Sequence, residues 1–176
     1  MKKINIVLIL LFFSITVFGQ NKKIVPENTV QFKIKNAGLS VNGSFKGLAG
    51  TIVFYADKLA ESFFEVSIDA KTVNTGNNSR DGHLKKKEYF DVETYPKINF
   101  KSKKIEATKT GYLTTGYLTI KGKVKEISIL FTYTEKNSEG LFTGSFVLNR
   151  LDYGVGESSW ILSDEVTILL NIKVVN

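Results

Sequence analysis

The sequence contains no cysteine, one histidine and two prolines among its 176 residues. Without cysteine there is no disulfide, no thiolate metal site and no thiol nucleophile, so a chain of this length depends on its hydrophobic core for stability. The single histidine, His83, cannot form a histidine-rich zinc site. We therefore expect no metal, no cofactor and no enzymatic activity.

Other catalytic and binding motifs are also missing. There is no Gly-x-Ser-x-Gly elbow of a serine hydrolase. The segment nearest to a phosphate-binding loop, GYLTIKGKV, has the wrong glycine spacing and places Val124 where Ser or Thr is required. The net charge of +7 is scattered rather than gathered in one patch, so a nucleic-acid partner is not expected.

The first residues have the pattern of a secretory signal peptide. Lys2 and Lys3 precede an apolar run from Ile4 to Phe18, and a small residue, Gly19, follows. The run is shorter than the about 20 apolar residues of a membrane span, and no second one follows. We expect a signal peptide at residues 1–19, cleavage near Gly19/Gln20, and a mature domain at residues 20–176, periplasmic or secreted, without a transmembrane segment.

Alternation of apolar and polar residues dominates the chain from Thr29 onward, which is typical of β-strands with one buried face. Turn sequences rich in Gly, Asn and Lys separate the runs, giving eight or nine strands at hairpin spacing. The residues that alternation places on common faces are Val30, Phe32 and Ile34; Phe64, Val66, Ile68 and Ala70; Ile127, Ile129, Phe131 and Tyr133; Phe142, Gly144, Phe146 and Leu148; and Val166, Ile168, Leu170, Ile172 and Val174.

So many consecutive strands form either a sandwich or a closed barrel, since both protect the strand edges. We favour an all-β, antiparallel barrel of eight strands or nearly so, which encloses roughly enough room for one elongated ligand. Gly111, Gly116 and Gly122 stand where long strands could bend. Alternation does not tell which face of each strand points inward.

The alternation is interrupted between Ser79 and Phe90, where we expect a short helix around residues 80–90. Ser79 can cap its N-terminus, and Asp81 lies in the first turn, where the helix dipole favours a carboxylate. His83 could act with Asp81 as an acid–base pair, but a surface or half-buried histidine is the favoured interpretation. Arg80 either pins the helix or contacts a ligand head group, and Trp160 either plugs one end or, in the favoured interpretation, anchors a loop.

A pattern of spaced residues over residues 72–102 resembles the signature of the YceI-like family. The signature runs from a Thr-containing turn through Arg-Asp-x-His-Leu and Phe-Asp to Tyr-Pro-x-Ile-x-Phe. The matching positions are Thr75, Arg80, Asp81, His83, Leu84, Phe90, Asp91, Tyr95, Pro96, Ile98 and Phe100. The resemblance extends over almost all of the mature chain through FKIKNAGLSVNGSFKGLAGTIVF, GYLTIKGKVKEISI, LNRLDYGVG and LSDEVTILLNIKV.

The resemblance implies an exported, lipocalin-like barrel that holds a long apolar molecule such as a polyisoprenoid in a tunnel. Enzymatic activity is not implied. Arg80, His83 and Arg150 are candidates to meet a polar head group, such as a quinone or a pyrophosphate, at one mouth. The sequence departs from many relatives at Asn36, where they carry histidine. The residues expected to bind the ligand are Phe32, Phe54, Phe64, Val66, Ile68, Arg80, His83, Phe100, Leu118, Ile129, Phe131, Phe146 and Arg150.

The partner expected from these observations is a long-chain isoprenoid, a quinone-like molecule or a fatty lipid, bound for transport or storage. The modest basic charge is compatible with transient contact with a membrane surface. The sequence does not decide whether the protein forms a homodimer. The alternative function is a structural or stress-protective barrel whose interior is fully packed and holds no ligand. That alternative predicts aromatic side chains throughout the barrel and no tunnel.

Overall fold

The alternating segments form ten β-strands in a computed structural model that describes residues 21–175. The strands are β1 (Asn21–Ile24), β2 (Val30–Asn36), β3 (Leu39–Phe45), β4 (Ala49–Val53), β5 (Phe63–Asp69), β6 (Lys97–Thr108), β7 (Gly111–Ile120), β8 (Lys123–Lys136), β9 (Glu139–Asn149) and β10 (Leu162–Val175). The helical elements are α1 (Asn78–Leu84) and the 3-10 turns η1 (Leu59–Glu61), η2 (Ala70–Thr72) and η3 (Arg150–Tyr153). The expected signal peptide, residues 1–19, lies outside the described residues.

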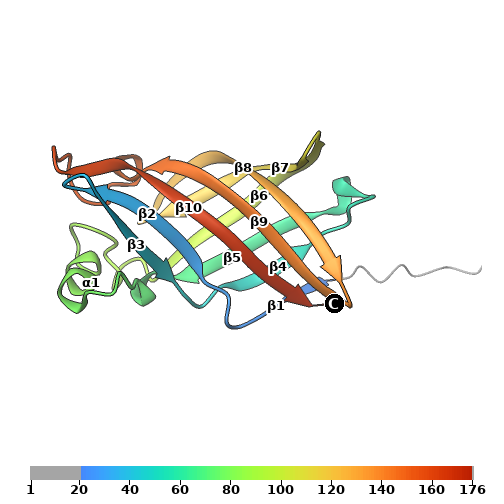
Figure 1. Ribbon diagram of the computed structural model, residues 1–176, viewed down its shortest axis with the longest axis horizontal. Coiled ribbons are helices and arrows are strands. Elements are labelled where there is room, and N and C mark those ends of the chain that lie inside the picture. The colour runs from blue at the N-terminus through green and yellow to red at the C-terminus, as the bar shows by residue number, and fades with distance from the viewer. Residues whose placement is uncertain (1–20, 176) are drawn as a thin grey trace, which may run out of the picture.

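The ten strands fill eight positions around a closed antiparallel barrel (Figure 1). β1 and β2 lie one after the other along the same edge of β10, and β3 and β4 likewise continue each other beside them. β1 closes the barrel because it pairs with β4 on one side and with β10 on the other. The predicted all-β barrel of eight strands is therefore confirmed.

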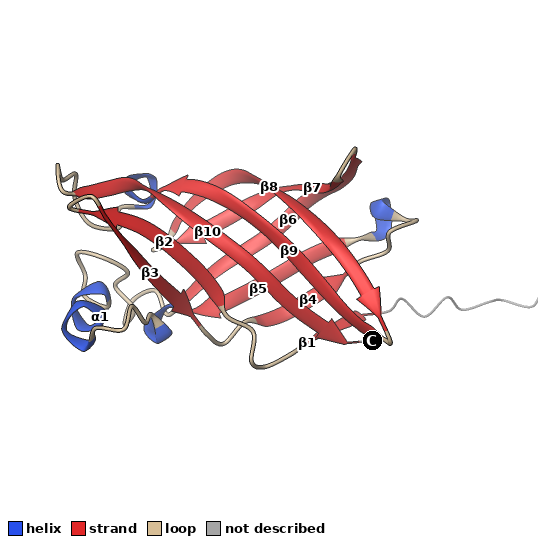
Figure 2. Cartoon of the chain, in the orientation of Figure 1, coloured by secondary structure: helices blue, strands red, loops and turns tan. Residues whose placement is uncertain are grey.

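The apolar faces predicted from alternation point into the barrel. On β5, Phe64, Val66 and Ile68 face the interior, whereas Glu65 between them is exposed. The long strands β8, β9 and β10 show the same pattern and cross the barrel obliquely (Figure 2). The apolar face is inward on each of these strands because a closed barrel buries one side of its sheet.

Two of the predicted glycine positions have a definite structural role. Gly122 follows Lys121 in the turn between β7 and β8, and both residues have positive φ, at 72° and 50°. Such turns match the twist of the paired strands, and glycine adopts them without steric cost. Gly116 faces an irregularity in the pairing of β6. A Cβ atom on Gly116 would lie 2.4 Å from the carbonyl oxygen of Lys101, so a larger residue does not fit there without a shift.

The helix is confirmed, but it lies earlier than predicted and is shorter. It runs from Asn78 to Leu84, and its N-cap is Asn77, whose side chain accepts a hydrogen bond from the Arg80 backbone N–H at 3.0 Å. The prediction of Ser79 as the cap was therefore wrong. Asn77 is the cap because it stands one residue before the first helical turn and has extended backbone angles. From this position a side-chain oxygen reaches the free N–H groups of the first turn.

The segment around α1 is tied to the edge of β3. Ser44 and Asn74 exchange two backbone hydrogen bonds, of 2.8 and 3.0 Å. The Thr72 hydroxyl accepts a bond from the Lys46 N–H at 2.8 Å. This segment therefore lies across one end of the barrel, on the left in Figure 1. Neither α1 nor the three 3-10 turns of the described part has the length or apolar character to cross a membrane.

Candidate ligand-binding cavity

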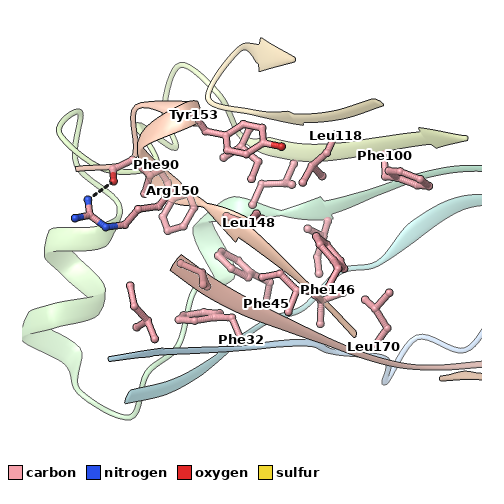
Figure 3. Close-up of a pocket in the computed structure, with 18 of the residues that line it drawn as sticks. Phe32, Phe45, Phe90, Phe100, Leu118, Phe146, Leu148, Arg150, Tyr153 and Leu170 are labelled. Carbon is pink, nitrogen blue, oxygen red and sulfur yellow. Dashed lines mark hydrogen bonds between the residues drawn. The ribbon is translucent and has the colours of Figure 1, made fainter. Parts of the chain in front are cut away.

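The barrel interior contains a cavity of about 710 Å³, bordered by side chains from almost every strand (Figure 3). Its walls are mainly aliphatic and aromatic, and they include Phe32, Phe100, Leu118, Phe146 and Leu170. Strand alternation produces this lining directly, because every second residue of each strand faces the interior. The volume lies within the range of about 300–1,000 Å³ that is usual for small-molecule sites.

One end of the interior is closed by a group of packed rings, which we term the aromatic cluster. Its members are Phe54, Phe64, Tyr112, Phe131, Tyr133 and Phe142. Phe54 lies at the centre, with ring centroids of Tyr133 at 4.9 Å and Tyr112 at 5.0 Å, both edge-on. These are favourable geometries for aromatic pairs. The barrel is therefore packed at this end and hollow beyond it.

An ion pair between a buried lysine and an exposed glutamate lies beside the aromatic cluster. Lys22 on β1 contacts Glu135 on β8, with 2.9 Å between Nζ and Oε2, and its Nζ lies 5.5 Å from the centre of the Tyr133 ring. Burial lowers the pKa of Lys22, but hydrogen bonds to Glu135 and Tyr133 outweigh this and raise it above 10.5. Lys22 is therefore charged at neutral pH and ties the closing strand β1 to β8.

The opposite end of the cavity reaches solvent beside α1, and we term this opening the mouth. Asn77, Ser79 and His83 border the cavity and are also exposed, so the cavity and the solvent meet there. Arg80 is half-buried at the same place. Its Nε and Nη2 donate to the hydroxyl and carbonyl oxygens of Thr75 at 2.7 and 3.0 Å. This leaves Nη1 of Arg80 without a partner among residues 21–175.

Asp81 and His83 do not form the acid–base pair considered from the sequence. The Asp81 carboxylate is buried and accepts bonds from the backbone N–H and the hydroxyl of Thr75, at 2.9 and 2.5 Å. His83 is exposed, and no side-chain hydrogen bond connects it to a carboxylate of the described residues. Asp81 thus holds the loop before α1 in place rather than activating His83.

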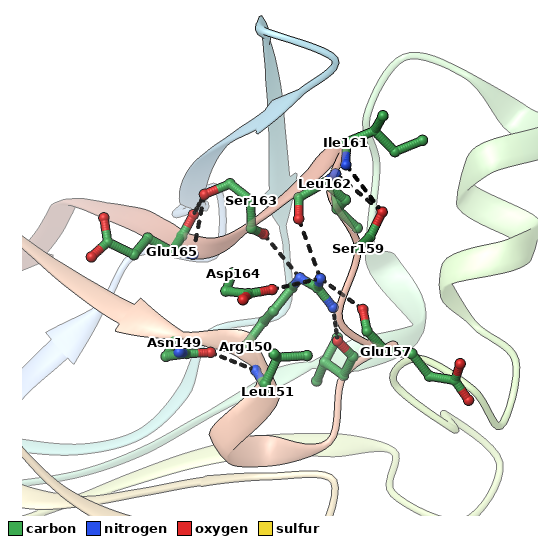
Figure 4. A network of polar contacts seen from close by, with 11 residues as sticks. Asn149, Arg150, Leu151, Glu157, Ser159, Ile161, Leu162, Ser163, Asp164 and Glu165 are labelled. Atoms are coloured by element: carbon green, nitrogen blue, oxygen red, sulfur yellow. Dashed lines mark hydrogen bonds and ion pairs between the residues drawn. The ribbon is translucent and has the colours of Figure 1, made fainter.

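Arg150 borders the cavity, but its guanidinium group is turned away from it (Figures 3 and 4). The residue is 4% exposed. Nε donates to the carbonyl of Ser163 at 2.9 Å, and Nη1 to that of Val155 at 2.9 Å. Nη2 contacts the carbonyls of Glu157 and Leu162 and the carboxylate of Asp164.

Every nitrogen of the Arg150 guanidinium group therefore has a protein partner. The sequence prediction that Arg150 meets a ligand head group does not agree with this orientation. The charge instead connects the loop after η3, through Val155 and Glu157, to the start of β10, through Leu162, Ser163 and Asp164.

The predicted ligand-binding residues all border the cavity except Phe54, which belongs to the aromatic cluster. Those at the cavity wall are Phe32, Phe64, Val66, Ile68, Arg80, His83, Phe100, Leu118, Ile129, Phe131, Phe146 and Arg150. Contact with a ligand stays a prediction for each of them. Asn36, the noted departure from the family pattern, also borders the cavity.

Several cavity residues were not predicted from the sequence. They include Phe45, Phe90, Ile98, Leu148 and Tyr153. Leu148 belongs to a recognised alternating face and could have been chosen by extending that face. Phe90 and Tyr153 follow no strand period, because one lies after α1 and the other in η3. Only their presence in the family pattern could have indicated them.

Three exposed apolar side chains stand at the start of β3 and just before β10, at the same end of the barrel as α1 (Figure 1), and we term them the apolar tip. Trp160 is 96% exposed, Leu39 74% and Ile161 46%. The carbonyl of Ile161 accepts a bond from the N–H of Ala37 at 2.7 Å, which joins the two loops that carry the tip. Trp160 therefore neither plugs the barrel nor anchors its loop by burial, which corrects both interpretations made from the sequence.

The fold and cavity define a lipocalin-like barrel, closed at one end and open at the other. A family model described as the YceI-like domain matches residues 23–174. A UPF0312 protein of Pseudomonas syringae pv. tomato is 34% identical over 153 residues, which cover 78% of each chain. The chain belongs to the YceI-like family, as its sequence pattern predicted.

Solved structures share the barrel. Burkholderia cenocepacia BcnA superposes with a TM-score of 0.81 at 26% identity, covering 86% of this chain and 99% of that chain. A polyisoprenoid binding domain from Saccharophagus degradans, implicated in plant cell wall breakdown, has a TM-score of 0.64 at 15% identity, covering 88% of this chain and 97% of that one. The second likeness shows the fold alone.

Proposed function

We propose that the protein binds one long isoprenoid or similar lipid chain inside its barrel. The observation that carries this proposal is the cavity of about 710 Å³ with its apolar wall. A hydrocarbon chain offers no hydrogen bonds, so its binding free energy comes from burial, at about 25 cal/mol per Å² of apolar surface. The relative described as a polyisoprenoid binding domain supports the choice of ligand class.

The same site favours binding over catalysis. The acid–base candidates considered from the sequence lie near the mouth, where Asp81 is engaged by Thr75 and His83 has no carboxylate of the described residues bonded to it. A general acid–base mechanism needs two such groups within reach of one substrate atom. The partly unpaired guanidinium group of Arg80, with the exposed His83, instead suits contact with a polar or anionic head group that stays near solvent.

Extraction of the purified protein with organic solvent, followed by mass spectrometry, tests the proposal. We expect a long apolar molecule in the extract at close to one per protein chain. Whether the extracted molecule is an acyl lipid or an isoprenoid would then define the ligand class. A protein purified without detergent that yields no lipid, and takes up none when lipid is offered, would favour the structural or stress-protective alternative. The hollow interior already differs from the fully packed barrel which that alternative predicts.

We further propose that the protein is exported and carries its ligand to or from a lipid surface through the mouth. An apolar chain leaves a membrane most easily where it does not cross water, so the carrier has to bring its opening close to the lipid. The apolar tip stands beside the mouth, since Asn36 and Leu162 border the cavity next to Ala37 and Ile161. Tryptophan is enriched at membrane interfaces, where its ring meets both lipid and water.

Trp160 is the only tryptophan in the chain, so its fluorescence reports on the tip alone. With vesicles of phosphatidylethanolamine and phosphatidylglycerol, we expect its emission to shift to shorter wavelength as the ring enters the interface. Leu39→Ser should weaken vesicle binding about tenfold, because it removes a side chain whose burial contributes about 1.5–3 kcal/mol.

Val147→Ser is the matched control, since Val147 is 58% exposed on the outer side of β9 and is not part of the tip. It should leave the vesicle affinity unchanged. Ligand transfer to vesicles without any change in Trp160 emission would show that another surface makes the contact.

A further inference from the structure

The hydroxyl group of Tyr153 is a buried polar group without a partner. Tyr153 ends η3 and is 2% exposed. Its oxygen has no hydrogen bond to any residue in the described range 21–175. Most buried polar side-chain atoms in folded proteins are paired, and an unpaired one destabilises the fold because it has lost its water. This hydroxyl group therefore needs an explanation.

The ring packs among apolar side chains. Tyr153 packs in an apolar cluster with Leu118, Ile120 and Val155. Burial, with a smaller contribution from the negative charge of Asp152, raises the pKa of Tyr153 to about 12. The group is therefore neutral at physiological pH and keeps its proton, so it can donate a hydrogen bond.

Tyr153 borders the cavity, and its hydroxyl group points into the barrel toward Leu118 (Figure 3). The guanidinium group of Arg150, from the same turn, points the opposite way. The side chains of Arg150 and Tyr153 thus have different environments. Arg150 is saturated by protein acceptors, whereas Tyr153 directs a single donor toward the interior that a ligand would occupy.

We infer that the Tyr153 hydroxyl group donates a hydrogen bond to an oxygen atom of the bound ligand. The inference rests on the proposed function and narrows it. The preferred ligand is a long apolar chain that carries an acceptor oxygen, such as a carbonyl or ether oxygen, rather than a pure hydrocarbon. Neighbouring atoms cover the hydroxyl oxygen. A ligand oxygen reaches it when one of the side chains packed around it moves aside, and Leu118 is the neighbour toward which the hydroxyl group points.

A pair of matched probes tests the inference. Geranylgeranylacetone, an isoprenoid ketone, is compared with the hydrocarbon in which a methylene group replaces its carbonyl group. Competition against a bound fluorescent lipid gives the two dissociation constants. We expect the wild-type protein to bind the ketone about tenfold more tightly than the hydrocarbon, which corresponds to about 1.4 kcal/mol. Tyr153→Phe should bind both probes with the same affinity, that of the wild-type protein for the hydrocarbon.

The variant should fold, because it removes only a hydroxyl group that has no partner. Tyr112→Phe is the matched control, since Tyr112 lies in the aromatic cluster and does not border the cavity. It should keep the ketone preference. If Tyr153→Phe also keeps that preference, the inference is wrong. If the wild-type protein binds the hydrocarbon and the ketone equally, it is likewise wrong, whereas the proposed function stands. Failure to bind either probe would overturn both.

Discussion

Val66→Trp is expected to empty the barrel of its ligand. Val66 on β5 borders the cavity, so an indole ring at this position extends into the space that the proposed lipid chain occupies. We expect the purified variant to retain less than about a tenth of the wild-type lipid, equivalent to a loss of at least about 1.4 kcal/mol in binding. Solvent extraction and mass spectrometry, normalised to protein, measure the difference.

The stability of the same variant distinguishes a cavity from a packed core. An added ring that enters empty space should change the free energy of unfolding of the lipid-free protein by less than about 1 kcal/mol. In a fully packed interior, overpacking costs about 1–3 kcal/mol. Glu65→Trp is the matched control, because the neighbouring side chain lies on the outer face of β5. It should keep both the lipid and the stability. Equal lipid content in the two variants would contradict the proposed site.

Arg150→Met should cause the largest loss of stability among substitutions at the mouth end of the barrel. Methionine keeps an unbranched apolar stem but removes the charge that contacts four carbonyl groups and Asp164. Hydrogen bonds to charged groups contribute about 1.5–3 kcal/mol each, and they are not additive. We expect the free energy of unfolding, measured by urea denaturation, to fall by about 3–5 kcal/mol.

Arg80→Met provides the comparison for Arg150. Arg80 is half-buried, and both side-chain hydrogen bonds that it makes within the described residues go to Thr75, five residues away in the chain. Its loss should lower the free energy of unfolding by only about 1 kcal/mol. Similar losses for the two variants would mean that the Arg150 network does not hold the loop before β10.

The barrel and the grouping of apolar residues on common strand faces could be predicted because strand geometry leaves a direct signal in the sequence. Which of the two faces points inward could not be predicted. On β5, residues Phe64, Val66 and Ile68 alternate with polar residues, and the structure keeps them together. Alternation does not measure how far the interior is filled. It therefore could not show that Phe54 lies in the aromatic cluster while Phe146 borders open space.

The roles of single polar residues could not be predicted from periodicity. The family pattern Asn-Arg-x-Asp-Tyr-Gly marked residues 149–154 as important without saying why. In the structure, Asn149 caps η3 through the Leu151 N–H, and Gly154 adopts the left-handed conformation that ends it. Most partners of Arg150 are backbone carbonyl groups, which every residue carries, so the sequence does not indicate which of them it contacts. For this reason its charge was assigned to a ligand rather than to the loop.

The pairing of β1 with β10 has a consequence for how the protein is made. It joins Lys23 to Val175 and Ile24 to Val174, residues from opposite ends of the described chain. Contacts between such distant residues form late, because a long loop has to be ordered before they form. During synthesis the edge of β1 that pairs with β10 stays unpaired until β10 has been made, so the barrel closes only then. A lipid bound as proposed would therefore enter during closure, or afterwards through the mouth, and not before the last strand has been made.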